Sequence, residues 1–525
     1  MAPASTTTCI EVGIVTIPMY RRGGWYAHPM SFLGPGEESV PFDVRPFDRS
    51  LVSGVTWTVV VRWAAKAVSL TSMLYVVRIL TPGDFGLVSM ASIPIGLAQL
   101  IGDLGLQTVV VQNRTLSEDE LASVATSALG VGALLTVLFI VLSRPIALYF
   151  REPAVAAVIV VLSLTFLADS IQVLPRALLQ RDLEFRTLAW LHGLQVTIAA
   201  LVLAGGATLS LGYWALVLNT LVSSGVITMV LYTLRPFRLA WPSEFGSVTG
   251  ALVAGWRVTV SRIAWYGYSS LDSMLIGRVL GKDALGIFDS AKSFAALPEA
   301  EVTSMVSKVV PGVFSSVQNS LPALRRYFLL LTEAVSYLTL PASVGLALTA
   351  EEFVRLALGP QWEAVIVPLR ILCLYIACSS SQMLLSHVLL WTGHLRVNMW
   401  VNLLSLVFLP ACFYLGLTWG VPGVAWAWVF GFPLIVVLKI VLVSRILDVA
   451  PTAYLSALRP ALIASLAMTS VVLLVRASLP ISWSPQARLA LQASTGAVTY
   501  ILVLLGAFHH RVGTIYETIR VAARS

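Results

Sequence analysis

Residues 259–281 read TVSRIAWYGYSSLDSMLIGRVLG, and this stretch decides the class of fold. As a helix rising about 1.5 Å per residue, it is long enough to cross the roughly 30 Å of hydrocarbon in a bilayer, and most of it is apolar. It nevertheless carries Arg262 and Asp272, and ionisable groups inside a membrane are costly and usually functional. The stretch therefore predicts a membrane helix with functional residues on the face that points into the protein.

The whole chain has the composition of an integral membrane protein. Of its 525 residues, 57% are hydrophobic and 11% are charged, and the mean hydropathy is +0.85. An average soluble domain has about 25% charged residues. Apolar runs of about 20 residues recur from residue 51 almost to the end, whereas a membrane β-barrel shows alternating segments of about 10 residues. We predict an all-α polytopic membrane protein.

Fourteen runs qualify as membrane spans, and we expect two pseudo-symmetric lobes of six helices followed by two further helices. The predicted divisions are a tail at 1–50, an N-lobe at 51–235, a C-lobe at 249–445, a final helix pair at 458–507 and a tail at 508–525. The spans are 52–77, 84–108, 119–143, 155–175, 187–207, 211–234, 249–275, 286–311, 324–349, 363–390, 396–417, 422–444, 458–476 and 487–507.

The distribution of positive charge gives the orientation. If the amino terminus is cytosolic, the tails and loops on the cytosolic side hold more than twice as many Lys and Arg residues as those on the other side. The positive-inside bias therefore predicts that both termini are cytosolic. Residues 1–50 are rich in proline and glycine and contain no adequate span, so we expect either a mobile cytosolic tail or residues that precede the true start codon.

The chain lacks the motifs of several enzyme and metal-protein classes. Its four cysteines match neither a redox pair nor a zinc spacing, and its six histidines form no metal set. There is no phosphate-binding Gly-rich loop, no His-Glu-x-x-His and no Gly-x-Ser-x-Gly. The net charge of +8 lies mostly in short loops and reflects topology rather than nucleic-acid binding. We expect no catalytic residues, no cofactor and no metal.

An internal repeat relates the two predicted lobes. Arg78 and Gly86 recur 200 residues later as Arg278 and Gly286, in similar surroundings. A second set of similar segments, after the fourth and tenth spans, is offset by 211 residues. An even number of spans separates the repeats, so both halves have the same orientation. Parallel repeats of this kind are related by an axis along the membrane normal and meet at a central substrate cavity.

Cations lie where that cavity is expected. Arg62 and Lys66 are four residues apart in the first span and so share a helix face, and Arg257 and Arg262 lie in the seventh. Each could instead form an internal ion pair, or reach an interface if it lay near a span end. Cations stacked on one face repel each other unless water or an anion meets them, which favours a hydrated cationic vestibule. Arginine suits a phosphate or pyrophosphate group.

Other charged and aromatic residues complete the predicted site. Trp265 and Tyr266 follow Arg262 closely and could pack against sugar rings, although they could equally be core residues. Four acidic residues are candidates for coupling to H⁺ or Na⁺ because they lie inside predicted spans. They are Asp103, Asp169, Asp272 and Glu299.

Five motifs, in this order and spacing, resemble those of the polysaccharide transporter family, the oligosaccharide-lipid flippases of the multidrug and oligosaccharidyl-lipid exporter superfamily. The resemblance covers about residues 51–510. The motifs are RILTPGDFGL at 78–87, DLGL at 103–106, DSMLIGRVLG at 272–281, PGVFS at 311–315 and LGPQW at 358–362.

The resemblance implies fourteen spans, two six-span lobes that open alternately to either side, and a lipid-linked sugar intermediate as cargo. Our hypothesis is a flippase of the bacterial cytoplasmic membrane that carries undecaprenyl-pyrophosphate-linked oligosaccharide for exopolysaccharide or O-antigen-like synthesis. Its partners would be membrane lipids, polysaccharide polymerase and export machinery. The alternatives are a flippase for the peptidoglycan lipid precursor, a cation-coupled drug antiporter of the same superfamily, and a polysaccharide polymerase or ligase, which would be expected to carry a sizeable external loop.

Overall fold

The computed structural model describes residues 19–21, 24–26, 45–102, 106–112, 116–239, 246–317, 320–379, 382–480 and 483–522. The chain divides into two units, Met1–Thr56 and Trp57–Ser525. In the first unit, strand β1 (Met19–Arg21) pairs antiparallel with β2 (Gly24–Tyr26), with Met19 opposite Tyr26. Most of the predicted tail, including residues 1–18 and 27–44, lies outside the described residues.

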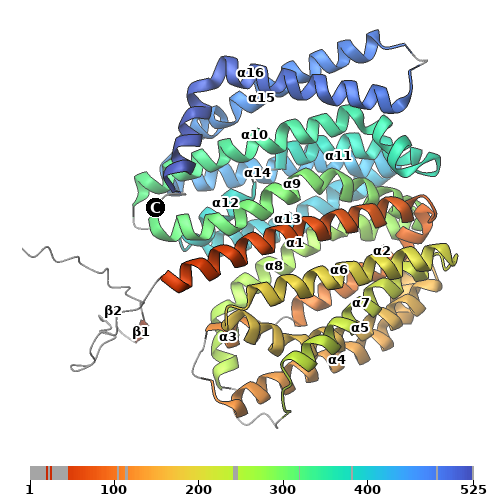
Figure 1. The fold of residues 1–525 in the computed structure, drawn as a ribbon, viewed down its shortest axis with the longest axis vertical. Coiled ribbons are helices and arrows are strands. Elements are labelled where there is room, and N and C mark those ends of the chain that lie inside the picture. Colours follow the sequence, from red (N-terminus) through yellow and green to blue (C-terminus); the bar gives the residue numbers. More distant parts are fainter. Residues whose placement is uncertain are drawn as a thin grey trace, which may run out of the picture. The chain divides into compact units, whose positions relative to one another are not determined.

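Helices account for nearly all of the second unit (Figure 1). The first seven are α1 (Arg45–Val77), which begins in the first unit, α2 (Pro82–Gly102), α3 (Leu106–Gln112), α4 (Glu118–Phe150), α5 (Ala154–Arg181), α6 (Phe185–Thr208) and α7 (Tyr213–Leu234). The next are α8 (Gly246–Val279), α9 (Lys282–Val317), α10 (Leu321–Phe353), the short η1 (Val354–Leu358) and η2 (Pro360–Val365), α11 (Ile366–Ser379) and α12 (Gln382–Trp391). The last are α13 (Leu395–Gly416), η3 (Leu417–Trp419), α14 (Gly420–Leu447), α15 (Pro451–Ser478) and α16 (Pro485–Ala522).

Local sequence explains several of the helix ends. At the start of α4, the Ser117 side chain accepts a hydrogen bond from the Glu120 amide, and the Glu120 carboxylate accepts one from the Ser117 amide at 2.7 Å. This capping box satisfies amides that the first turn of a helix leaves unpaired. The helix ends at Arg151, which adopts a left-handed conformation (φ 57°). Its backbone amide donates hydrogen bonds to carbonyls in the last turn of α4.

Each of the fourteen predicted spans falls on one helix or on two or three consecutive helices. By length and composition, nine stretches of the described residues could cross a membrane, and one of them, Leu395–Leu447, covers two predicted spans. The predicted spans 52–77, 84–108, 249–275 and 286–311 are not among the nine. The all-α membrane fold is thus confirmed, while the total of fourteen crossings stays a prediction.

The helices of the second unit pack as two groups. Helices α2 to α7 contact one another, as do α8 to α14, and α15 and α16 pack against α10 (Figure 1). The groups meet chiefly where α2 packs against α8 and α9. One hydrophobic cluster runs through this boundary and includes Leu87, Phe150, Phe288 and Trp362. The contact between the groups is therefore part of the core of the unit.

Candidate functional site

The two helix groups approach each other most closely where α2 and α9 begin. A Cβ on Gly86 would overlap the carbonyl oxygen of Lys282, and a Cβ on Gly286 would overlap that of Pro82. Only glycine lets two helix backbones come this near. The two glycines are 200 residues apart in sequence, so the sequence repeat appears in space as a pseudo-two-fold contact.

A second pair of equivalent residues joins the groups through arginine. Arg78 donates from Nη2 to the Leu356 carbonyl at 2.5 Å and from Nε to the Ala357 carbonyl at 3.3 Å. Arg278 donates to the carbonyls of 148–149, at the end of α4. Each arginine thus binds carbonyls beside the carboxyl end of a helix in the opposite group, where the helix dipole attracts a cation.

Further hydrogen bonds join the helices near the start of α2 and α9. Trp362 is fully buried and donates from Nε1 to the Val77 carbonyl at 2.8 Å, and Gln361 donates to the same oxygen at 2.9 Å. Ser89 donates to the Asp289 carboxylate, joining α2 to α9. We call this set of contacts the closure. Its residues are Arg78, Gly86, Ser89, Arg278, Gly286, Asp289, Gln361 and Trp362.

The predicted cations lie elsewhere on α1 and α8. Arg62 is partly buried and Arg262 is exposed. Neither guanidinium has a hydrogen bond or an ion pair with a residue that the structure describes. Lys66 forms an ion pair with Glu301 on α9, with 2.8 Å between Nζ and Oε1, so this cation is neutralised by an internal partner. The Arg257 side chain lies outside the described residues.

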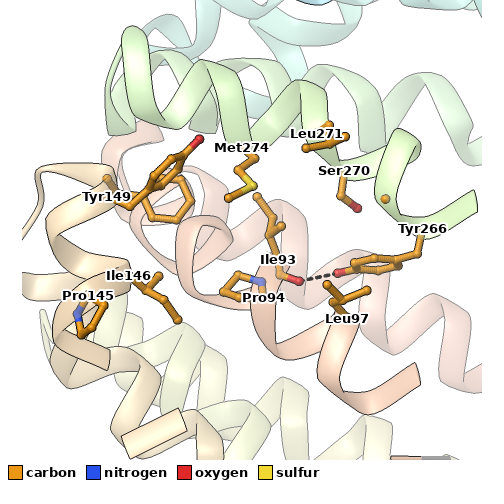
Figure 2. Close-up of a pocket in the computed structure, with 12 residues that line it drawn as sticks. Ile93, Pro94, Leu97, Pro145, Ile146, Tyr149, Tyr266, Ser270, Leu271 and Met274 are labelled. Atoms are coloured by element: carbon orange, nitrogen blue, oxygen red, sulfur yellow. Dashed lines mark hydrogen bonds between the residues drawn. The ribbon is translucent and has the colours of Figure 1, made fainter. Parts of the chain in front are cut away.

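The two predicted aromatic residues have different environments. Trp265 is 52% exposed. Tyr266 donates its hydroxyl hydrogen bond to the Ile93 carbonyl of α2 at 2.8 Å (Figure 2). A Cβ on Gly96 would overlap the Tyr266 hydroxyl, so the missing side chain at 96 creates the space for the ring. Tyr266 therefore joins α8 to α2 in this conformation.

The four acidic candidates are not brought together into one described site. Asp103 lies outside the described residues. Asp169 accepts hydrogen bonds from Gln99 at 3.2 Å and from Ser224 at 3.3 Å. Glu299 is partly buried, and its carboxylate has no hydrogen bond or ion pair with any described residue. The described residues contain no group of three or more metal-binding side chains.

Asp272, near the centre of the stretch 259–281, is fully buried, and its carboxylate is paired and hydrogen-bonded. Its carboxylate lies 2.6 Å from the Lys292 ammonium and accepts a 2.8 Å hydrogen bond from the Trp428 indole. A buried charge is tolerated when it is both paired and hydrogen-bonded. The alternative of an internal ion pair therefore describes Asp272.

Sequence reasoning passed over two charged residues. Asp289 belongs to the closure, and its position repeats that of Ser89 at the 200-residue offset. Lys439 is 1% exposed, and its ammonium lies 3.1 Å from Ser386 Oγ and 3.5 Å from Asn402 Oδ1. Both lie inside predicted spans, 286–311 and 422–444. A complete count of the charges within each span would have found them.

Comparison with known proteins places this arrangement in a family. Residues 75–367, more than half of the chain, match the model of a family described as polysaccharide biosynthesis protein. The chain belongs to this family. The matched range includes every residue of the closure, and the family predicted from the five motifs is confirmed.

Two relatives within this group of proteins carry informative names. The lipopolysaccharide biosynthesis protein WzxC of Escherichia coli K12 is 26% identical over 398 residues, which cover 74% of this chain and 79% of WzxC. The succinoglycan biosynthesis transport protein ExoT of Rhizobium meliloti is 23% identical, over 60% of this chain and 64% of ExoT. The chain is thus a multi-pass membrane protein of polysaccharide biosynthesis, and its relatives point to transport rather than catalysis.

Solved structures share the fold. The lipid II flippase MurJ in an inward closed conformation aligns with a TM-score of 0.71 at 13% identity, over 87% of this chain and 99% of MurJ. An inward-facing multidrug resistance transporter of the MATE family aligns with a TM-score of 0.61 at 15% identity, over 73% of this chain and 94% of that one. At these identities the likeness concerns the fold alone.

Proposed function

We propose that this protein is a flippase that moves an undecaprenyl-pyrophosphate-linked oligosaccharide from the inner to the outer leaflet of the bacterial cytoplasmic membrane for surface polysaccharide assembly. One observation carries the proposal. The two helix groups are held together at one end by a pseudo-symmetric closure. Helices α1 and α8, which lead to this closure, carry Arg62 and Arg262, and neither arginine has an acidic partner among the described residues.

The spacing of these arginines follows the repeat. Arg62 precedes Arg78 by 16 residues, and Arg262 precedes Arg278 by 16 residues, so each lies about 24 Å along its helix from the closure. Two guanidinium groups at matching depths on α1 and α8 suit the two phosphates of a pyrophosphate, which accept paired, charge-assisted hydrogen bonds. Arg257 extends this set on α8. Lys66 joins it only if the ion pair with Glu301 opens.

Transport follows by alternating access. With both termini cytosolic, the closure lies on the outer side and the arginines are reached from the cytosol. The head group enters and binds there while the lipid tail stays in the bilayer. Separation of α2 from α9, with release of Arg78 and Arg278 from their carbonyl partners, opens the outer side and lets the sugar leave.

Energy for the cycle comes from a bound H⁺ or Na⁺, or from later consumption of the product by polymerase and export machinery. Glu299 is the carboxylate best suited to couple, because no described residue already holds its oxygens. Asp169 accepts hydrogen bonds from the neutral side chains of Gln99 and Ser224, and Asp103 is a further candidate. Asp272 is less suited because Lys292 and Trp428 occupy it.

The test is export in cells that lack the chromosomal gene and carry plasmid-borne variants. Arg62→Ala and Arg262→Ala, singly and together, are compared with Arg459→Ala, which removes an exposed arginine from α15. We expect the double variant to lose most surface polysaccharide and to accumulate lipid-linked precursor in the inner leaflet. Each lost arginine contact weakens binding by about tenfold or more.

Three outcomes would contradict the proposal. A well-expressed double variant that exports normally would refute the role of the arginines. Normal polysaccharide with altered drug tolerance in the deletion strain would favour an antiporter. Loss of peptidoglycan synthesis with intact surface polysaccharide would favour the peptidoglycan precursor as cargo.

A further inference from the structure

A cavity lies between the helix groups, and Tyr266 of the predicted site is part of its lining. Its volume is about 320 Å³, and the residues that line it lie within 93–97 of α2, 145–150 of α4 and 266–274 of α8 (Figure 2). Two walls belong to the first helix group and one to the second. Whatever fills this space therefore contacts both groups at once.

The walls are suited to hydrocarbon rather than to water. Ile93, Leu97, Ile146, Leu271 and Met274 present carbon and sulfur to the cavity (Figure 2). The hydroxyl of Tyr266, one of the few polar groups in the lining, already donates to the Ile93 carbonyl. A water molecule needs two to four polar partners, and an apolar cavity that lacks them stays dry.

The surroundings indicate where in the bilayer the cavity lies. Leu148, in the same turn as the α4 wall, is 76% exposed, as expected of a side chain that faces lipid. Exposed arginines flank that wall at Arg144 and Arg151, and the Arg278 guanidinium lies 5.3 Å from the centre of the Tyr149 ring. Arginines near helix ends extend to the phosphate level of a bilayer. The α4 wall therefore lies just below lipid phosphates.

We propose that this cavity binds one acyl chain of an anionic membrane phospholipid, whose phosphate lies at Arg144 and Arg151. At about 30 Å³ for each water-sized group, the cavity holds roughly ten methylene groups, which is part of one acyl chain. The three cations flanking the α4 wall select an anionic head.

The bound chain stabilises the closed conformation. Tyr149 lines the cavity, and its carbonyl accepts a hydrogen bond from Arg278, a residue of the closure. A chain that fills the space between α2, α4 and α8 holds these walls in contact through their apolar surface. Opening of the closure would expel the chain, so the anionic phospholipid content of the membrane sets the stability of the closed state.

The test is photolabelling of the purified full chain in detergent. The probe is phosphatidylglycerol with a diazirine on one acyl chain, and labelled residues are mapped by peptide mass spectrometry. Ile146→Trp fills the cavity, whereas Val141→Trp adds the same bulk to α4 at a side chain that is 67% exposed. We expect labels on 93–97, 145–150 and 266–274 that fall about tenfold in Ile146→Trp and persist in Val141→Trp.

Competing lipids identify the occupant. Unlabelled phosphatidylglycerol should displace the probe well below the concentration at which phosphatidylcholine does, and Arg144→Ala with Arg151→Ala should remove this difference. Equal labelling of Ile146→Trp and wild type, both eluting as single species on gel filtration, would overturn the proposal. So would more effective displacement by polyprenyl phosphate, which would assign the cavity to a lipid carrier. None of these outcomes depends on polysaccharide export.

Discussion

At the scale of single residues, two glycines set the distance between the helix groups. In an open helix, alanine is favoured over glycine by about 1 kcal/mol because glycine loses more conformational freedom on folding. At Gly86 and Gly286 the neighbouring carbonyls leave no room for a methyl group. Replacing either glycine by alanine should therefore destabilise the protein, whereas the same replacement in an open helix stabilises it.

We predict that Gly86→Ala destabilises the purified protein by about 1–3 kcal/mol, the usual cost of overpacking. The matched control is Gly205→Ala in α6, where a Cβ would meet nothing within 4 Å. That variant should be neutral or slightly more stable. Thermal unfolding in detergent measures both, and equal melting temperatures for the two variants would show that α2 and α9 do not pack as described.

The two arginines of the closure, Arg78 and Arg278, give a second prediction. A Cβ on Gly83 would touch the Asp283 carboxylate, so cysteines at both positions should form a disulfide in membranes when the native cysteines have been replaced. Arg278→Ala removes the bonds to the end of α4 and should slow this cross-linking several-fold, because each charge-assisted hydrogen bond contributes about 1.5–3 kcal/mol.

Arg459→Ala is the control for the cross-linking experiment, since Arg459 is exposed on α15 and has no contact with the closure. It should leave the rate unchanged. If Arg278→Ala and Arg459→Ala cross-link alike, then Arg278 does not hold the groups together.

At the scale of elements, the Lys66–Glu301 pair links α1 to α9. Both side chains are about one third exposed, so the pair should contribute only about 0.2–1 kcal/mol to stability. The pair matters more for function, because it determines whether the Lys66 ammonium is available to bind the substrate. A cation already paired on a neighbouring helix is less available to hold a pyrophosphate.

We predict that Lys66→Glu and Glu301→Lys each impair export and that the double exchange restores it, because the exchange preserves the pair. Surface polysaccharide is the readout, normalised to the amount of protein in the membrane. Export that is lost with Lys66→Glu and not recovered by the exchange would instead assign Lys66 to the substrate.

At the scale of the whole molecule, the closure constrains the topology. It gathers the ends of α1, α4, α8 and α10 at one place, and these helices carry the first, third, seventh and ninth predicted spans. Odd-numbered spans all end on the same side if every predicted span crosses the membrane. The closure is thus compatible with two parallel halves.

We predict that alkaline phosphatase is active when fused after Gly281, and that green fluorescent protein is fluorescent when fused after Asp182 or Ser525. Phosphatase activity requires export, whereas the fluorescent protein folds in the cytosol. The positive-inside bias is the physical reason for this orientation. A fluorescent fusion after Gly281 would reverse the orientation, and with it the side from which the arginines are reached.

The sequence by itself determined the membrane class, the positions of the helices, the repeat and the family. The length of an apolar segment and the charges that flank it are local properties, and each membrane helix is inserted according to its own length and charges. They can therefore be predicted without knowledge of the tertiary contacts. Even the glycines and arginines of the closure were visible as a repeat with an offset of 200 residues. Their partners were not.

Only the tertiary structure decided which charged side chains are paired with an opposite charge among the described residues. Lys66 was predicted to share a cationic site with Arg62 and Arg262, yet Glu301 neutralises it, while the two arginines have no described partner. Asp272, a candidate for ion coupling, is paired with Lys292. Tyr266, a candidate for packing against sugar, joins α8 to α2. The physical reason is that the state of a charge or hydroxyl inside a membrane depends on groups within a few ångströms, and those groups come from helices distant in the chain.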